Sequence, residues 1–255
     1  MNTSAGFQSH DAMNLHLTGL SAVVTGGSSG IGAAIVRVLA EEGCDVAFCA
    51  RNQAPIDSLL ASVAALPGKV TARALDVTDG TAFAIWLSSL NAFDIFIPNV
   101  SALSSNWQCA VETDIQAAVN TTEAAIPFLA RSRNAAITYI GSKASSLAAP
   151  QSAAYGAAKA AMAHYMKSLA SRLLPTVRVN TVSPGDTLAE RGFWDKVRQQ
   201  EPDAFAKVVE RNPMGRLATP DEIARVVAFI SSPAASFVAG ANWYVDGGSI
   251  KHVQA

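Results

Sequence analysis

Short apolar runs alternate with longer helical patterns along almost the whole chain of 255 residues. Runs with the length and composition of buried strands cover residues 22–25, 45–50, 70–75, 95–98, 136–140, 177–182 and 242–245. Helical patterns lie between them, near residues 30–42, 53–66, 79–89, 105–131, 152–174 and 219–231. This alternation is typical of parallel βαβ units, whose right-handed crossovers place helices on both faces of a sheet. The sequence therefore predicts one α/β domain built on a doubly wound parallel sheet of about seven strands.

Two segments fall outside this alternation. Residues 1–14 show no apolar periodicity and are expected to form a flexible N-terminal extension, which leaves residues 15–255 for the domain. The segment from about 186 to 216 interrupts the alternation where a strand ends, at the edge where open α/β sheets bind ligands. We expect it to form a lobe of short helices that covers the substrate. An insertion that contacts another subunit would explain the same pattern and stays open.

Charged residues make up only 15% of the chain, against roughly 25% in average soluble domains. The net charge is −1 and no block of like charges occurs, which argues against nucleic acid and against a polybasic membrane anchor. The uncharged stretches 12–36 and 226–245 are broken by glycine, serine or proline, so no spanning helix is expected. The three cysteines form no CxxC pair, and the histidines have no metal spacing. We therefore expect a cytoplasmic protein without a metal, whose uncharged surface lies in subunit contacts or apolar clefts.

The first strand runs directly into a glycine-rich turn, GGSSGIG at residues 26–32, which is followed by the apolar positions of a helix. Glycines allow a tight turn and bring N–H groups close to a ligand, and the helix N-terminus favours a pyrophosphate. Together with the second strand about twenty residues further on, this arrangement predicts a dinucleotide site. Its expected contacts are Gly26, Ser28, Ser29, Gly30, Ile31 and Gly32.

The end of the second strand indicates which dinucleotide binds. A carboxylate there would bind the ribose hydroxyls of NAD, whereas this chain has Ala50 followed by Arg51. A guanidinium suits the 2′-phosphate of NADP, so NADP(H) is the expected cofactor; NAD(H) is the alternative if Arg51 is only a solvated surface residue. Asp76 and Val77, after the third strand, are candidate adenine contacts, and Asp76 could equally cap the helix that begins near Asp79.

Motifs further along the chain resemble the classical short-chain dehydrogenase/reductase family over residues 15–250. They are TGGSSGIG at 25–32, Ser142, YGAAK at 155–159, NTVSPG at 180–185 and VDGG at 245–248. The resemblance implies a Rossmann-type fold and an NAD(P)-dependent oxidoreductase that acts on CH–OH groups. It also implies homotetramers (or homodimers) built through the long helices and the C-terminal segment.

Ser142, Tyr155 and Lys159 would carry the chemistry that this resemblance implies. Tyr155 and Lys159 are four residues apart and share one helix face. A phenol titrates near 10, and a neighbouring ammonium favours the phenolate, so Tyr155 is suited to exchange a proton with a carbinol or carbonyl oxygen. Ser142 is expected to hydrogen-bond the same oxygen, and the resemblance implies that Lys159 also binds the nicotinamide ribose. Phe193 and Trp194 are the expected wall of the substrate pocket.

Three positions depart from the family pattern. Residues 98–101 read Pro-Asn-Val-Ser where Asn-Asn-Ala-Gly is common, so the backbone beside the cofactor ribose, with the expected contact Asn99, must differ locally. Asp114 stands in the place of the family's fourth catalytic residue, an asparagine, and lacks its amide donors. Ala189 stands where a threonine that binds the carboxamide is frequent. The expected nicotinamide contacts are therefore Pro184, Gly185 and Thr187.

The sequence thus predicts an NADP-dependent oxidoreductase that interconverts a ketone and a secondary alcohol. Small-molecule substrates from three classes stay open: 3-oxoacyl thioesters, cyclic or small aliphatic ketones, and sugar-like polyols. An NAD-preferring alcohol or polyol dehydrogenase is one alternative. A non-catalytic dinucleotide-binding redox sensor is another, since a fold alone does not fix function. The complete set of serine, tyrosine and lysine argues against the sensor.

Overall fold

The computed structural model describes residues 13–251 and 253, so the extension expected over residues 1–14 lies almost wholly outside the described residues. Parallel strands form a seven-stranded sheet in the order β3-β2-β1-β4-β5-β6-β7. The strands are β1 (Ser21–Thr25), β2 (Asp45–Ala50), β3 (Val70–Ala74), β4 (Ile95–Ile97), β5 (Ala136–Ile140), β6 (Arg178–Pro184) and β7 (Asn242–Val245). The predicted doubly wound parallel sheet is confirmed.

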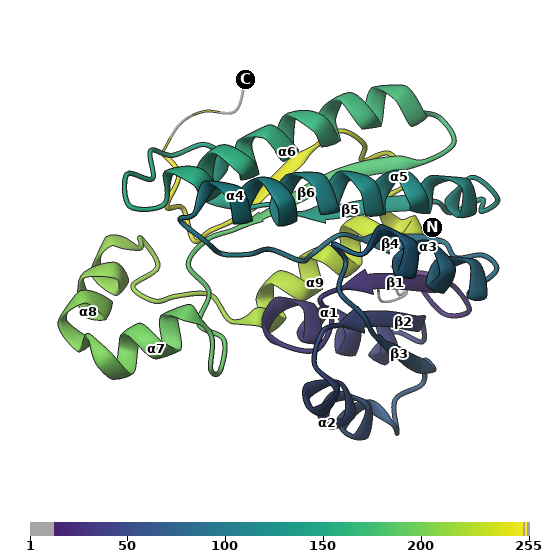
Figure 1. The fold of residues 1–255 in the computed structure, drawn as a ribbon, viewed down its shortest axis with the longest axis horizontal. Coiled ribbons are helices and arrows are strands. Elements are labelled where there is room, and N and C mark those ends of the chain that lie inside the picture. Colours follow the sequence, from purple (N-terminus) through teal and green to yellow (C-terminus); the bar gives the residue numbers. More distant parts are fainter. Residues whose placement is uncertain (1–12, 252, 254–255) are drawn as a thin grey trace, which may run out of the picture.

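Helices cover both faces of the sheet (Figure 1). One face carries α1 (Gly30–Glu41), α2 (Gln53–Val63) and α9 (Pro220–Ser231), and the other carries α3 (Gly80–Ser89), α5 (Ala118–Leu129) and α6 (Ala153–Leu173). Short helices η2 (Lys143–Ser145) and η3 (Pro233–Ala235) lie in connections. Side chains alternate along each strand, so Val23 and Phe96 pack on the α6 side while Val24 and Ile97 pack on the α1 side. Burial on both faces explains why the central strands β1, β4 and β5 are largely apolar.

The stretch that the sequence predicts as one helix over residues 105–131 is divided in the structure. It consists of α4 (Trp107–Cys109), the π-helix η1 (Ala110–Ala117) and α5. The hydrophobic pattern of the sequence does not reveal this change, because a π-helical turn contains only about one residue more than an α-helical turn. Single π-turns inside α-helices occur frequently at functional sites. Here the π-helix contains the buried Asp114.

The segment expected to form a lobe near 186–216 does contain short helices, α7 (Phe193–Gln200) and α8 (Pro202–Arg211). Figure 1 shows them standing apart from the main body, on the side to which β6 leads. The lobe begins and ends at a narrow neck. There, Leu188 N–H donates to the Ala218 carbonyl (2.8 Å) and Ala218 N–H donates to the Asp186 carbonyl (3.0 Å). Two backbone hydrogen bonds thus hold both ends of the lobe beside the sheet.

Arg178, the first residue of β6, binds the C-terminal end of α9 with its side chain. Its guanidinium donates to the carbonyls of Ile230, Ser231, Ser232 and Val238, at 3.0 to 3.2 Å. Burial lowers the pKa of this arginine below its ordinary value. The last carbonyls of a helix have no partner within the helix, and here one side chain satisfies several of them.

Arg178→Met keeps an apolar stem but removes all these donors. We expect the free energy of unfolding to fall by about 2–3 kcal/mol, since buried acceptors lose charge-assisted partners. Urea denaturation at one protein concentration measures it. Arg225→Met, a change at an exposed position of α9, is the matched control and should stay within about 0.5 kcal/mol of the parent. A loss for Arg178→Met as small as the control's would contradict this role.

Candidate active site

The glycine-rich turn between β1 and α1 has the geometry of a phosphate-binding turn. Gly26 has φ +70°, in the left-handed region that favours glycine. The N–H groups of Gly26 and Gly27 both donate to the Cys49 carbonyl, at 2.8 and 3.1 Å, which fixes the turn against β2. A Cβ placed on Gly32 would lie 2.1 Å from the Gly26 carbonyl oxygen, so only glycine lets α1 pack this closely on the turn.

The N-terminus of α1 points into this turn and fits the pyrophosphate of a dinucleotide. Ser29 is the N-cap residue, and its side chain makes no capping hydrogen bond. The first N–H groups of a helix carry partial positive charge and favour an anion. Ala189, from the loop after β6, would touch a Cβ on Gly30 at 3.8 Å. The chain that enters the lobe therefore passes directly over the turn.

Asn99 fixes the turn from the β4 side. Its amide Nδ2 donates to the carbonyls of Thr25 (3.0 Å) and Gly26 (3.2 Å), and its N–H donates to Thr25 Oγ1 (2.9 Å). Ser101 replaces a glycine without strain, because left-handed backbone occurs at Leu103 (φ +48°) and not at Ser101. The side chain of Asn99 thus shapes the dinucleotide site by holding its backbone.

Arg51 and Asp76 follow the carboxyl ends of β2 and β3. Arg51 is exposed, and the Leu75 N–H donates to the Ala50 carbonyl, so both strand ends lie side by side. Asp76 Oδ1 accepts from the N–H and hydroxyl of Thr78 at 2.9 and 2.8 Å. The alternative that Asp76 caps the next helix is wrong, because Asp79 caps α3 by accepting from the Ala82 N–H. Val77 is buried beside them.

Lys159 lies at the centre of the candidate catalytic residues and is almost completely buried. Its Nζ donates to Tyr139 Oη (3.0 Å) and to the Ile140 carbonyl (3.2 Å). Nζ also lies 5.7 Å from the ring centroid of Tyr155 and 3.5 Å from Asp114 Oδ1. Burial disfavours the ammonium, but the oxygens of both tyrosines and of Asp114 outweigh it and raise the pKa of Lys159. Lys159 is therefore a fixed cation under the Tyr155 ring.

Ser142 is brought towards Tyr155 by close packing of η2 on α6. Ser142 is the N-cap of η2, and its Oγ accepts from the Ala144 N–H at 3.1 Å. A Cβ on Gly156 would lie 3.2 Å from the Ala144 carbonyl oxygen, so the glycine next to Tyr155 permits this close approach. With its acceptor side engaged, the hydroxyl of Ser142 keeps its proton for a substrate oxygen.

Asp114 is held by η1 with both carboxylate oxygens inside the protein. Oδ2 accepts from the Ala102 N–H at 3.1 Å. Oδ1 is buried and has no hydrogen-bond partner among the described residues. A buried acceptor beside Lys159 fits a hydroxyl donor such as those of a nicotinamide ribose. Together, the α1 N-terminus, the glycine-rich turn and this acceptor fit a bound dinucleotide.

Comparison with known proteins identifies a matching family model and similar enzymes. The family model described as enoyl-(acyl carrier protein) reductase matches residues 26–249. The chain is 31% identical over 249 residues to isoepoxydon dehydrogenase patN of Penicillium expansum, covering 91% of this chain and 95% of the relative. It is 28% identical over 250 residues to the 3-oxoacyl-[acyl-carrier-protein] reductase FabG of Thermotoga maritima, covering 92% of this chain and 100% of the relative.

Among solved structures, L-sorbose reductase from Gluconobacter frateurii, complexed with NADPH and L-sorbose, superposes with a TM-score of 0.87. Its sequence is 26% identical, and the match covers 94% of this chain and 100% of that chain. This chain is a classical short-chain dehydrogenase/reductase. It is accordingly an NAD(P)-dependent oxidoreductase.

In this short-chain dehydrogenase/reductase, the loop after β6 meets the loop after β5. Lys143, next to Ser142, forms an ion pair of 2.5 Å with Asp186, next to Gly185. Thr187 Oγ1 donates to the Gly185 carbonyl (3.1 Å). This hydrogen bond does not test the expected contact between Thr187 and the nicotinamide, which stays a prediction. The ion pair joins the loop that carries Ser142 to the end of β6 and the loop after it, where the expected nicotinamide contacts Pro184, Gly185 and Thr187 lie.

Phe193 and Trp194 lie at the start of α7. Their rings meet edge to face at 5.0 Å, with Trp194 half-buried and Phe193 63% exposed. The predicted role of this pair as a pocket wall is compatible with so exposed a ring only if a substrate or a partner covers it.

Sequence reasoning missed Tyr139, Lys143 and Gly156. A tyrosine in a strand expected to be buried was the available signal for Tyr139, because a buried hydroxyl needs a partner. His164 is exposed on α6. Within residues 13–251 and 253, no group of three or more histidine, cysteine, aspartate or glutamate residues is placed to hold a metal. Over the same residues, no helix is both long and apolar enough to cross a bilayer.

Proposed function

We propose that this enzyme interconverts a ketone and a secondary alcohol with NADP(H) as the preferred cofactor, Tyr155 acting as general acid/base. The observation that carries the proposal is the buried Lys159 ammonium beneath the Tyr155 ring, next to the Ser142 turn. A fixed cation beside a phenol favours transfer of the phenolic proton.

Each residue has one role in ketone reduction. NADPH, when bound, supplies the hydride. Ser142 donates a hydrogen bond to the carbonyl oxygen and orients it towards Tyr155. Tyr155 gives its proton to that oxygen as it becomes an alkoxide, and Lys159 stabilises the phenolate that remains. In alcohol oxidation the same groups act in reverse.

A ketone panel with NADPH tests this function. Oxidation of NADPH that depends on the ketone supports it. The panel should contain a 3-oxoacyl thioester, a cyclic ketone, a small aliphatic ketone and a ketose, since these represent the substrate classes left open by the sequence. Tight NADPH binding without turnover of any ketone would overturn it in favour of a dinucleotide-binding sensor.

The preference for NADP(H) rests on Arg51, and on the NADPH bound by the L-sorbose reductase relative. We expect Arg51→Ala to lower kcat/KM for NADPH by about 10- to 100-fold, the value of one or two charge-assisted hydrogen bonds to phosphate. The kcat/KM for NADH should change less than about two-fold. Arg133→Ala, an exposed arginine just before the amino end of β5, is the matched control. An equal loss with both cofactors would contradict the 2′-phosphate assignment.

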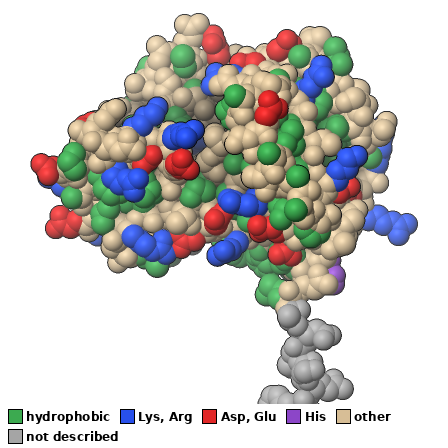
Figure 2. All heavy atoms as spheres, turned by 90° about the horizontal axis from the view of Figure 1, so that it is seen from below, with side chains coloured by type: hydrophobic (Ala, Val, Ile, Leu, Met, Phe, Trp, Pro, Cys, Tyr) green, Lys and Arg blue, Asp and Glu red, His purple; other side chains and the backbone are tan. Residues whose placement is uncertain are grey.

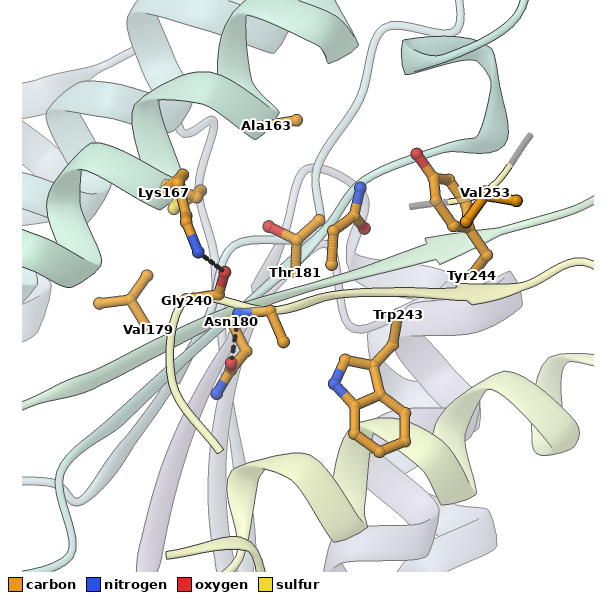
Figure 3. A pocket seen from close by; sticks show the side chains of 12 residues that line it. Ala163, Lys167, Val179, Asn180, Thr181, Gly240, Trp243, Tyr244 and Val253 are labelled. Carbon is orange, nitrogen blue, oxygen red and sulfur yellow. Dashed lines mark hydrogen bonds between the residues drawn. The ribbon is translucent and has the colours of Figure 1, made fainter. Parts of the chain in front are cut away.

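We also propose a homotetramer, in which the edge strand β7 lies in an interface. A hollow of about 880 Å³ lies along β7 and is lined from α6, β6 and β7 by residues such as Met166, Thr181 and Trp243 (Figure 3). None of its lining residues is a candidate catalytic residue. Trp243 and Phe237, in β7 and in the segment before it, are exposed large apolar side chains, and exposed apolar surface favours association. Sedimentation should give a tetramer, and a monomer at micromolar concentration would overturn the proposal.

The charge distribution agrees with a small-molecule substrate. On the face in Figure 2, basic and acidic side chains are interspersed. The electrostatic footprint of a nucleic-acid-binding protein is a basic patch of one sign. The proposed substrate is therefore a small-molecule carbonyl compound rather than a nucleic acid.

A further inference from the structure

Tyr139 makes a contact with Lys159 that neither the family resemblance nor the proposed mechanism uses. It lies in the middle of β5 and is only 1% exposed, among apolar residues of α6 such as Met162 and Met166. Phenylalanine would fill this core equally well. The hydroxyl instead accepts a hydrogen bond from Lys159 Nζ at 3.0 Å, and Nζ lies 5.0 Å from the centroid of the Tyr139 ring.

The ammonium of Lys159 has three N–H donors, and three protein oxygens surround it. Tyr139 Oη (3.0 Å) and the Ile140 carbonyl (3.2 Å) are hydrogen-bonded from the β5 side. Asp114 Oδ1, from η1, lies at 3.5 Å and is not within a hydrogen bond. Two oxygens of β5 therefore fix the position of Nζ, while the looser contact with Asp114 leaves the third donor for a bound hydroxyl.

The charge around Lys159 comes from a small set of groups. η1 contributes Asp114, β5 contributes Tyr139, and α6 itself contributes Tyr155. Lys143 of η2 is engaged by Asp186 at 2.5 Å. Arg178 of β6 is directed to the end of α9, as described above. Tyr139 and Asp114 are thus the two groups, besides Tyr155, that determine where the ammonium lies and how strongly it acts on the Tyr155 phenol.

We propose that Tyr139 is a positioning residue, which together with Asp114 sets how strongly Lys159 stabilises the phenolate of Tyr155. This inference rests on the proposed function. The two residues act in opposite directions. Tyr139 is neutral and holds the ammonium under the Tyr155 ring, whereas the Asp114 carboxylate offsets part of the ammonium's charge.

Opposite pH shifts are the expected signature in alcohol oxidation, where kcat/KM rises with pH as Tyr155 loses its proton. In Tyr139→Phe the ammonium loses one of its two hydrogen bonds to β5, the one that the Tyr139 hydroxyl accepts, so the pH of half-maximal kcat/KM should rise by about 0.5–1. In Asp114→Asn the offsetting charge is gone, so this pH should fall by a similar amount. Tyr139→Phe should also lower kcat of this oxidation about ten-fold and change KM for the alcohol less than about two-fold.

Tyr165→Phe is the matched control. It removes one phenolic hydroxyl from α6 that donates to Glu123 at 2.7 Å. Tyr165 is six residues from Lys159 on the same helix, but it is not among the groups that act on the ammonium. Its pH profile should be that of the parent. An unchanged profile and kcat in Tyr139→Phe would overturn the proposal, and so would a lower kcat that follows thermal destabilisation without any pH shift.

A second measurement separates this inference from the proposed function. In protein labelled with ¹⁵N-lysine, the Lys159 ammonium should give a resonance protected from solvent exchange, identified by its loss in Lys159→Met. The resonance should be lost or strongly shifted in Tyr139→Phe and retained in Tyr165→Phe. If no ketone is turned over, the proposed function fails while this result still decides the role of Tyr139. A resonance unaffected by Tyr139→Phe would overturn that role.

Discussion

Tyr155→Phe is expected to lower kcat for ketone reduction by about 10²- to 10⁴-fold, the contribution of a positioned general acid. The substitution removes only the hydroxyl and keeps the aromatic ring over Lys159, whose Nζ lies 5.7 Å from the ring centroid. Tyr155 is half-buried, so the fold does not depend on its hydroxyl. The dissociation constant of NADPH should therefore change less than about three-fold, because the glycine-rich turn and the α1 N-terminus are untouched.

Ser142→Ala gives the comparison that makes this prediction specific. Ser142 orients the carbonyl oxygen but transfers no proton in the proposed mechanism, so its loss should be smaller, about 10- to 100-fold. Steady-state kinetics with NADPH at saturation, together with fluorescence titration of NADPH, measures both variants. Full turnover by Tyr155→Phe with its best ketone would exclude Tyr155 as the proton donor.

The sequence predicted the architecture because the two faces of the sheet leave a strong signal. The central strands β1, β4 and β5 are largely apolar because they are buried on both sides, and helices such as α1 and α9 turn an apolar side to the sheet. The glycine-rich turn was equally readable, because Gly32 is required by a Cβ contact of 2.1 Å that no other residue could avoid. Such local requirements restrict residue type at a single position.

The surroundings of Lys159 were predicted only in part, because they depend on contacts between distant segments. Asp114 and Tyr139 are 45 and 20 residues from Lys159 in the sequence, yet both reach its ammonium. The position of Asp114 depends in addition on the π-helix, which leaves no trace in hydrophobic periodicity. The sequence identifies the residue types of the site, but it does not show which polar and charged groups surround the Lys159 ammonium.

Lys159→Met is expected to abolish activity and also to destabilise the fold by about 3–5 kcal/mol, the usual cost of leaving one partner of a buried ion pair unpaired. Lys159 and Asp114 are 2% and 1% exposed, and their charged atoms lie 3.5 Å apart. Because the pKa of Lys159 is raised, its stabilising effect is complete below the ordinary lysine pKa of 10.5 and is lost only as the pH rises past the raised value. Urea denaturation at pH 7 should therefore show the full loss.

The double variant Lys159→Met/Asp114→Asn separates stability from catalysis. With the aspartate charge also removed, no unpaired charge stays buried, so most of the lost stability should return. Turnover should not return, because no cation lies beside Tyr155 to stabilise its phenolate. All variants must be compared at one protein concentration, since the proposed tetramer would add to the apparent stability. If the double variant is as unstable as Lys159→Met, packing of the lysine stem rather than the buried charge pair maintains this part of the core, and the electrostatic account of Asp114 is wrong.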